Sequence, residues 1–288
     1  MAWVAGGSFL MGSDRFYREE RPARRQTVAG FWIDRTPVTN GQFALFVRAT
    51  GHVTSCEQPP DPGLYRDANP ALLVPGSLVF QQPPGPVDLR DYRAWWAYVP
   101  GADWQHPEGP GSTLAGRDDH PVVHVSAADV SAYAAWAGKV LPSEAEWEFA
   151  ARGGLDGAAY AWGDDAMPDG RLMANTWQGR FPWENVAEDG FEGTSPVGAF
   201  PANGYGLHDM IGNVWEWTAS PAAPHAEHKS CCVPSNPDPR LARQVVKGGS
   251  HLCAPNYCLR YRPAARQAEP SDTSTCHIGF RCIVREPA

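Results

Sequence analysis

Apolar residues recur at helical spacing in three segments of the sequence, and each segment opens with a residue type that caps helices. In the first, Phe43 and Phe46 share one face after Thr39, which begins a capping box. Comparable patterns follow Ser126 and Ser143, and a glycine comes soon after each apolar period. The pattern therefore predicts three helices, over residues 39–51, 126–138 and 143–153.

Short apolar runs bounded by glycine or polar turns predict strands instead. We expect strands within residues 6–13, 28–34, 78–80, 120–126, 258–262 and 279–284. The arginine-rich segment 14–26 is most simply a solvated loop, because its charges show no apolar period. Residues 59–110 are rich in proline and predicted to be irregular, although Trp95, Trp96 and Trp104 indicate that they are ordered.

Composition indicates a folded, loop-rich chain. The 288 residues include 29 glycines and 28 prolines, which mark many turns, yet 43% are hydrophobic and 12 are tryptophan. Such a chain is too apolar for a disordered segment and long enough to bury a large core. We expect an α+β fold with little regular secondary structure, in a single domain over residues 1–288.

Charge narrows the range of partners. The formal net charge of −8 argues against a protein that binds nucleic acid or an anionic membrane through a basic surface, whereas a basic peptide would suit it. No apolar run reaches the eighteen or so residues of a membrane span. Met1 leads directly into folded-looking sequence without a leader, so we expect a cytoplasmic protein.

Seven cysteines leave at least one thiol without a disulfide partner. They are Cys56, Cys231, Cys232, Cys253, Cys258, Cys276 and Cys282. In a reducing compartment most of them stay thiols, and a bridge between two adjacent cysteines, as at positions 231 and 232, would be strained. The pairing of Cys56, Cys231, Cys232, Cys276 and Cys282 stays open at this point.

Cys253 and Cys258 stand apart because only four residues separate them, just after Gly248 and Gly249. Two thiols this close can form a disulfide, bind a metal or carry out redox chemistry. Zinc normally takes a C-x2-C pair and a second ligand pair, which the sequence lacks. Two thiolates with no imidazole or carboxylate between them suit a soft ion, above all Cu(I). Chemistry alone leaves a structural disulfide and a thiolate metal or redox site both open.

Motifs spread over most of the chain indicate one family. They are residues 6–13, 36–43 and 101–117, Gly248-Gly249-Ser250, the C-x4-C pair with the Arg-Tyr-Arg after it, residues 264–266 and residues 279–282. Together they resemble the formylglycine-generating enzymes, also called sulfatase-modifying factors. The resemblance implies a C-type-lectin-like fold and an oxidase that converts a cysteine of a nascent sulfatase to the aldehyde residue formylglycine.

The resemblance also implies how the cysteines act. No side chain is an oxidant strong enough to remove hydrogen from a carbon beside sulfur, so something must bind oxygen. In the family this is Cu(I), here on Cys253 and Cys258, with the substrate thiolate as a third sulfur ligand. A hydrogen leaves the substrate Cβ, and hydrolysis gives formylglycine. Ser250 and Trp215 match positions that flank the oxygen pocket, which completes the predicted catalytic set.

Two structural calcium sites follow from the same resemblance. The first falls on the side chains of Asn175 and Asp189 and the carbonyls of Thr176 and Phe191. The second falls on the side chains of Asp209 and Glu216 and the carbonyls of Gly212 and Val214. Hard cations prefer such oxygen ligands in tight turns. The alternative is a network of hydrogen bonds that stabilises turns without an ion.

The implied partners are molecular oxygen and an unfolded or nascent sulfatase that carries Cys-x-Pro-x-Arg. We expect this protein to act as a monomer. Ser112 and Arg117 lie in the segment that resembles the family's peptide groove, and His277 stands near the groove where asparagine is common. Ala254 replaces a family histidine beside the first cysteine, so the site is tuned differently. Arg260, Arg262 and Arg266 are predicted to form a structural salt-bridge network, because alternate strand positions share a face.

Two other functions compete with this one. The scaffold also serves as a non-catalytic peptide- or ligand-binding module, which would have no use for paired cysteines. A related sulfur-oxidising enzyme is the second alternative. Such proteins carry an additional iron-binding helical domain with clustered histidines, which we do not expect here.

Overall fold

The computed structural model describes residues 1–222 and 242–286, in which turns and loops outweigh regular elements. Its α-helices are α1 (Asn40–Thr50), α2 (Ala127–Trp136) and α3 (Glu144–Arg152). Its 3-10 helices are η1 (Arg18–Glu20), η2 (Ser55–Glu57), η3 (Pro70–Leu72), η4 (Tyr92–Ala94) and η5 (Pro168–Gly170). The predicted α+β, loop-rich class is confirmed.

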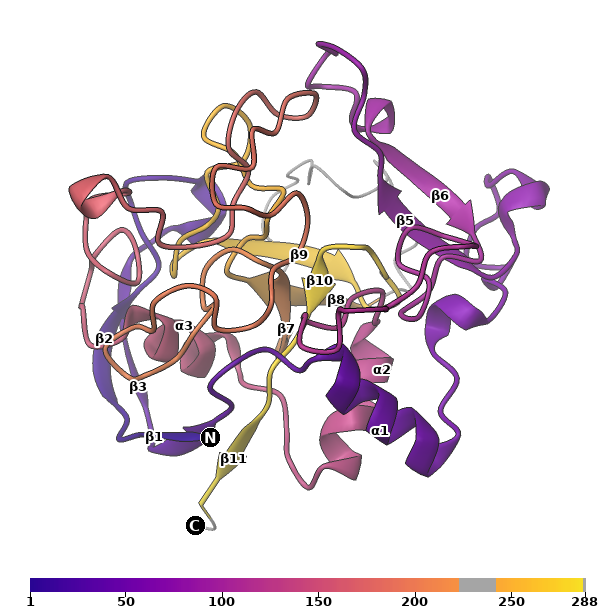
Figure 1. Cartoon of the computed structure of the whole chain (residues 1–288). Coiled ribbons are helices and arrows are strands. Elements are labelled where there is room, and N and C mark those ends of the chain that lie inside the picture. Colours follow the sequence, from indigo (N-terminus) through magenta and orange to yellow (C-terminus); the bar gives the residue numbers. More distant parts are fainter. Residues whose placement is uncertain (223–241, 287–288) are drawn as a thin grey trace.

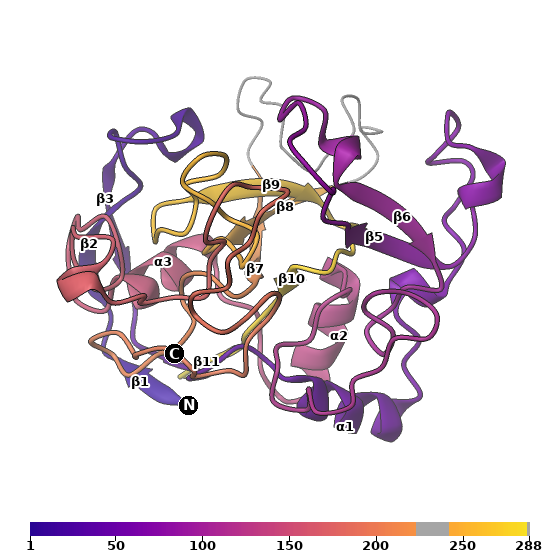
Figure 2. The same ribbon diagram turned by 45° about the horizontal axis from the view of Figure 1, so that its top comes forward.

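The strands form small separate sheets. The first seven are β1 (Ala2–Val4), β2 (Gly7–Met11), β3 (Arg24–Val28), β4 (Phe31–Ile33), β5 (Gly76–Phe80), β6 (Trp96–Pro100) and β7 (Trp215–Pro221). The others are β8 (Arg243–Lys247), β9 (Arg266–Pro270), β10 (Ile278–Gly279) and β11 (Ile283–Arg285). A four-stranded sheet of order β10-β7-β8-β9 lies between the β2-β3 hairpin and the β5-β6 hairpin (Figures 1 and 2). A sheet of order β1-β4-β11 brings the two termini to one side.

Local capping explains why the helices begin where the sequence predicts. The side chains of Thr39, Ser126 and Ser143 each accept a hydrogen bond from the backbone three residues later, and each completes a capping box. Gly51 and Gly153 end α1 and α3 in the left-handed conformation, at φ 68° and 57°. These three predictions are therefore confirmed to within a few residues.

The predicted strand over residues 258–262 is wrong. Residues 248–265 form a loop of turns that connects β8 to β9. Gly248 and Gly249 begin it with φ 94° and 73°, so the chain leaves the sheet at this point. A Cβ on Gly249 would lie 2.9 Å from the backbone of Arg260 and Tyr261, because the loop folds back against its own start. We call residues 248–265 the cysteine loop.

Three other expectations fail for specific reasons. Residues 120–126 form no strand beyond an isolated bridge at Pro121, and His124 has φ 59°, which interrupts extended backbone. Segment 14–26 is only partly the predicted solvated loop: its arginines are exposed, but it contains η1 and the start of β3, and its Glu20 is buried. The closing strand is divided into β10 and β11. Residues 59–110 are ordered, as expected, and they include β5 and β6.

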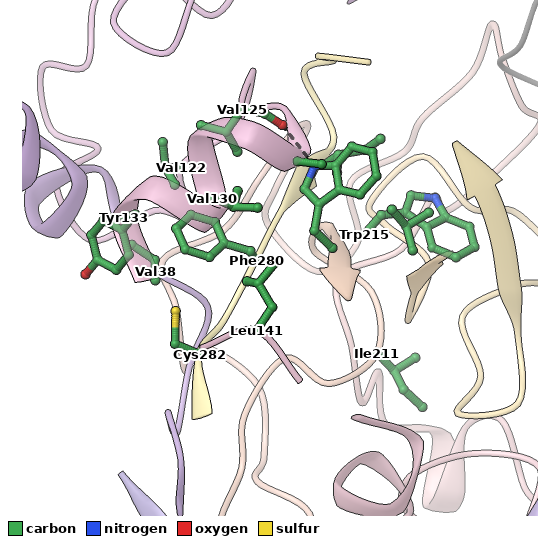
Figure 3. Close-up of a cluster of buried hydrophobic side chains, with 14 of the residues drawn as sticks. Val38, Val122, Val125, Val130, Tyr133, Leu141, Ile211, Trp215, Phe280 and Cys282 are labelled. Carbon is green, nitrogen blue, oxygen red and sulfur yellow. Dashed lines mark hydrogen bonds between the residues drawn. The ribbon is translucent and has the colours of Figure 1, made fainter. Parts of the chain in front are cut away.

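A large buried cluster joins α1, α2 and the four-stranded sheet. Figure 3 shows Val130, Tyr133 and Phe280 packed together, with Trp215 and Cys282 at different ends of the group. Cys253 and Cys258 belong to the same cluster, so the cysteine loop is seated on the main core. Among the described residues, no helix combines the length and apolar character that a bilayer crossing requires.

Candidate active site

The cysteine loop brings its two cysteines into direct contact. The Sγ atoms of Cys253 and Cys258 lie 3.5 Å apart, which is hydrogen-bond distance for thiols and far longer than the roughly 2 Å of a disulfide bond. Both side chains are buried. Burial raises the pKa of the Cys253 thiol well above its ordinary value, and the hydrogen bond with Cys258 raises it further. The structure thus presents two reduced thiols at one position.

Three distant segments hold this loop in place. The Trp177 amide donates to the carbonyl of Cys253 at 3.0 Å, and the His251 amide donates to Asn213 O at 2.9 Å. On the other side, the Leu259 amide donates to the hydroxyl of Tyr17 at 2.9 Å. Within the loop, the Cys258 amide donates to Ala254 O at 2.8 Å. That turn brings residue 258 back to residue 253, so backbone hydrogen bonds within the loop and to other segments position the two thiols.

Ser250, one of the two other predicted catalytic residues, contacts a thiol, and Trp215 lies in the same large buried cluster. The Ser250 amide points at Cys253 Sγ from 3.5 Å, while its hydroxyl accepts the Leu252 amide at 3.2 Å. Trp215 is buried in the cluster that also contains both cysteines. Ser250 thus contacts the thiol region, and the catalytic roles of Ser250 and Trp215 stay predictions.

Ser112 and Arg117 bind within their own loop. The Ser112 hydroxyl donates to Gly109 O at 2.7 Å, and Arg117 forms an ion pair with Glu108. Their contact with a peptide stays a prediction. His277 is buried instead, with its ring centroid 4.9 Å from that of Trp96.

His277 is also connected to the thiol region. Its carbonyl accepts the Trp215 amide at 2.9 Å, and its Nδ1 lies 2.7 Å from the Thr275 hydroxyl. Burial, and then nearby His251, lower the pKa of His277 to about 3, against a smaller opposite effect of Cys258. This imidazole is therefore neutral at neutral pH.

The first predicted calcium site contains oxygens that converge. The Gln178 side-chain amide donates to Thr176 O at 2.5 Å and to Asp189 Oδ2 at 2.8 Å, so a single donor bridges both. The Phe191 amide donates to the other carboxylate oxygen of Asp189 at 3.0 Å. Asn175 uses its side-chain amide to bind Gly193 O. This arrangement fits a cation that replaces the Gln178 amide between the two oxygens.

The second predicted calcium site fits less well. Both oxygens of the fully buried Glu216 accept hydrogen bonds from Arg281, and one also accepts the Trp147 indole N–H at 2.8 Å. Asp209 accepts the Gly198 amide at 2.7 Å, and burial raises the pKa of this carboxyl. Gly212 and Val214 lie in the turn between the two acids. An ion here would have to share Glu216 with Arg281.

Side chains alone do not assemble a larger metal site. Within residues 1–222 and 242–286, no group of three or more histidine, cysteine, aspartate or glutamate residues is arranged to hold an ion. His120 and His124, separated by three residues, are the candidates for the clustered histidines of the sulfur-oxidising alternative. Both ring nitrogens of His124 are hydrogen-bonded, one with the Ser77 hydroxyl and one with the carbonyl of Pro107. The ring of His120 is hydrogen-bonded with the Thr194 hydroxyl. That pair therefore gives no support to an iron site.

The remaining cysteines lie away from this chemistry or outside the described residues. Cys56 donates to His124 O at 3.2 Å, and Cys282 is fully buried, so burial raises the pKa of both thiols. Cys276 accepts the Phe80 amide at 3.3 Å. Cys231 and Cys232 fall outside the described residues.

The predicted arginine network is confirmed, although its residues do not share a strand. Arg260, Arg262 and Arg266 pair with Glu19, Glu20 and Glu144 respectively. Sequence reasoning missed the first two acids because they lie in a segment that looked solvated. Their partners are more than 240 residues away, and no local pattern indicates such a pairing.

Comparison with known proteins gives consistent results over the whole chain. The family model of the sulfatase-modifying factor enzyme 1-like domain matches residues 1–286. The chain is 59% identical to the formylglycine-generating enzyme of Mycobacterium tuberculosis, over 97% of this chain and 96% of that protein. It is also 40% identical to the mouse protein named inactive C-alpha-formylglycine-generating enzyme 2, over 98% of this chain and 87% of the other. Among solved structures, PvdO of Pseudomonas aeruginosa matches with a TM-score of 0.64 and 25% identity, over 98% of this chain and 92% of PvdO.

Proposed function

The chain belongs to the sulfatase-modifying factor family, and on that premise we propose that it is an oxidase that converts a sulfatase cysteine to Cα-formylglycine, using Cu(I) and molecular oxygen. The contact between the sulfurs of Cys253 and Cys258 carries the proposal. A relative named as inactive shows that the fold alone does not give activity. The thiol pair is the feature that favours catalysis here.

The donor set fits the proposed metal. Two sulfurs that are already adjacent, with hydrophobic surroundings, offer soft ligands and exclude water. When bound, the copper ion supplies the oxygen chemistry that no side chain can provide. Cys253 and Cys258 would hold it, the Ser250 amide would orient the sulfur of Cys253, and Trp215 lies in the same apolar cluster as both sulfurs.

The overall reaction balances with oxygen as the electron acceptor. The substrate cysteine loses one hydrogen from Cβ and one from its thiol, and its carbon then exchanges sulfur for the oxygen of water. One cysteine, one oxygen molecule and one water thus give the aldehyde, hydrogen sulfide and hydrogen peroxide. Ala254 is fully buried at the position of the family histidine, so no imidazole assists from there.

The proposed substrate is an unfolded or nascent sulfatase with a Cys-x-Pro-x-Arg segment. An acidic enzyme with a net charge of −8 suits a basic peptide. Ser112, Arg117 and His277 are the proposed contacts. We place this reaction in the cytoplasm, in a single-domain monomer that binds neither nucleic acid nor membrane.

Calcium is proposed as a structural ion. The convergence of Thr176 O and Asp189 on the Gln178 amide supports the site with Asn175 and Phe191. The proposal for Asp209, Gly212, Val214 and Glu216 has weaker support, because Arg281 already neutralises Glu216.

Mass spectrometry of a Cys-x-Pro-x-Arg peptide tests the function. After incubation in air with copper-loaded protein, the peptide should lose its sulfur and gain an aldehyde. Cys253→Ala and Cys258→Ala should each abolish this change while they retain the fold. Unchanged peptide with fully copper-loaded wild-type protein would refute the oxidase and favour a non-catalytic binder.

A further inference from the structure

Arg260 contacts the sulfur of Cys258, one of the two proposed copper ligands. Its Nη1 lies 3.7 Å from Cys258 Sγ, within hydrogen-bond range for a sulfur acceptor. The sequence places this arginine two residues after Cys258 and suggests only a structural ion pair. The contact with sulfur gives it a second partner of a different kind.

A separate segment fixes the guanidinium of Arg260. Its Nε and Nη2 both donate to Glu19 Oε1, at 3.1 and 2.5 Å. The guanidinium carbon lies 3.9 Å from the centroid of the Tyr17 ring. Tyr17 also accepts the amide of Leu259 through its hydroxyl. We call Tyr17, Glu19 and Arg260 the clamp.

The forked geometry of arginine matters in this arrangement. One edge of the guanidinium, Nε and Nη2, is used by Glu19, which leaves Nη1 directed at the sulfur. A lysine has a single ammonium and cannot fill both positions. The next arginine provides a contrast, because Arg262 binds Glu20 and Leu259 O instead.

Charge gives the contact a purpose. Two thiolates and one monovalent copper ion carry a net charge of minus one, and this charge would be buried. A guanidinium beside one sulfur offsets that charge and restricts the rotation of the Cys258 side chain. Partners behind metal ligands typically change metal affinity about 10- to 100-fold.

The geometry points to Arg260 as a positioning residue that holds Cys258 for Cu(I), with Glu19 and Tyr17 fixing Arg260 in turn. This inference rests on the proposed copper site. It assigns to the segment before β3, which is far from the cysteine loop in sequence, the role of fixing the loop arginine that orients this ligand.

Cu(I) affinity, measured in competition with a chromophoric chelator at fixed pH, tests the clamp without any turnover. We expect Arg260→Gln to weaken Cu(I) binding about 10- to 100-fold. The affinity of Arg260→Lys should lie between those of wild type and Arg260→Gln. Glu19→Gln leaves both cysteines and Arg260 in place and should weaken binding less. These two milder variants keep the test valid if Arg260→Gln does not fold.

Arg262→Lys is the matched control. It disturbs the neighbouring ion pair of the same loop, between Arg262 and Glu20, so it should lower the melting temperature of the apo protein yet leave Cu(I) affinity close to that of wild type. Equal affinity of wild type and the Arg260 variants overturns the clamp but leaves the copper site intact. A wild type that binds Cu(I) no better than Cys253→Ala overturns both.

Discussion

Replacement of Glu20 by glutamine should cost this protein much of its stability. Glu20 and Arg262 both have 0% side-chain exposure, and Arg262 Nη1 donates to Glu20 Oε2 at 2.8 Å. Glutamine keeps the shape of the side chain but removes the charge, so the guanidinium stays buried without a counter-ion. Loss of one partner from a buried pair typically costs about 3–5 kcal/mol.

The expected loss lies at the lower end of that range. Arg262 keeps its hydrogen bond to Leu259 O and its place 3.7 Å from the Phe16 ring centroid, and glutamine can still accept one hydrogen bond. About 3 kcal/mol corresponds to a fall in melting temperature of about 5 °C for a chain of 288 residues, at about 2.1 cal/mol/K of unfolding entropy per residue. Urea unfolding followed by fluorescence of the buried tryptophans measures the free energy directly.

Two further variants isolate the cause. Arg15→Gln removes an ion pair whose side chains are 63% and 68% exposed, so it should cost less than about 1 kcal/mol. The double variant Glu20→Leu with Arg262→Met removes both charges and should recover most of the loss. A loss below about 1 kcal/mol for Glu20→Gln, or a double variant no more stable than the single one, would refute the account.

Two other predictions follow from the site. Calcium should raise the melting temperature of the wild type. Asp189→Asn should remove most of that rise, since Asp189 is the one carboxylate among the four proposed ligands of its site. An unchanged calcium response in this variant would rule the site out. The pKa of His277 is about 3 in the folded state, below the unfolded value of about 6.5. The contribution of the buried neutral imidazole to stability is therefore fully present above about pH 6.5 and is lost as the pH falls toward 3. His277→Asn should therefore show a shallower decline of melting temperature from about pH 7 to pH 4.5, and a parallel decline would contradict burial of a neutral imidazole.

The sequence predicts helices well because their signals are local. Thr39, Ser126 and Ser143 each satisfy amides within one turn, so the start of a helix is encoded in four consecutive residues. The same holds for Gly51 and Gly153 at the ends. No distant contact is needed to find these boundaries.

The candidate site is predictable in its residues but not in its support. The two cysteines are visible from their spacing, but the strand expected around them fails because Gly249 turns the chain back on itself. Glu19 and Glu20 look solvated among arginines, and only the folded chain brings them to Arg260 and Arg262. Pairings over such separations depend on tertiary structure, which a single sequence does not display.

The cysteine loop has both ends fixed side by side. β8 and β9 pair in antiparallel register up to Lys247 opposite Arg266, so residues 248–265 leave the sheet and return to it at adjacent positions. A segment anchored in this way can change its interior residues, as at Ala254, without altering the frame that carries it. Related chains could therefore adjust metal chemistry by exchanging a short insert. A transplanted loop would need the flanking strands, its acidic partners and its contacts with Tyr17, Trp177 and Asn213 to keep its shape.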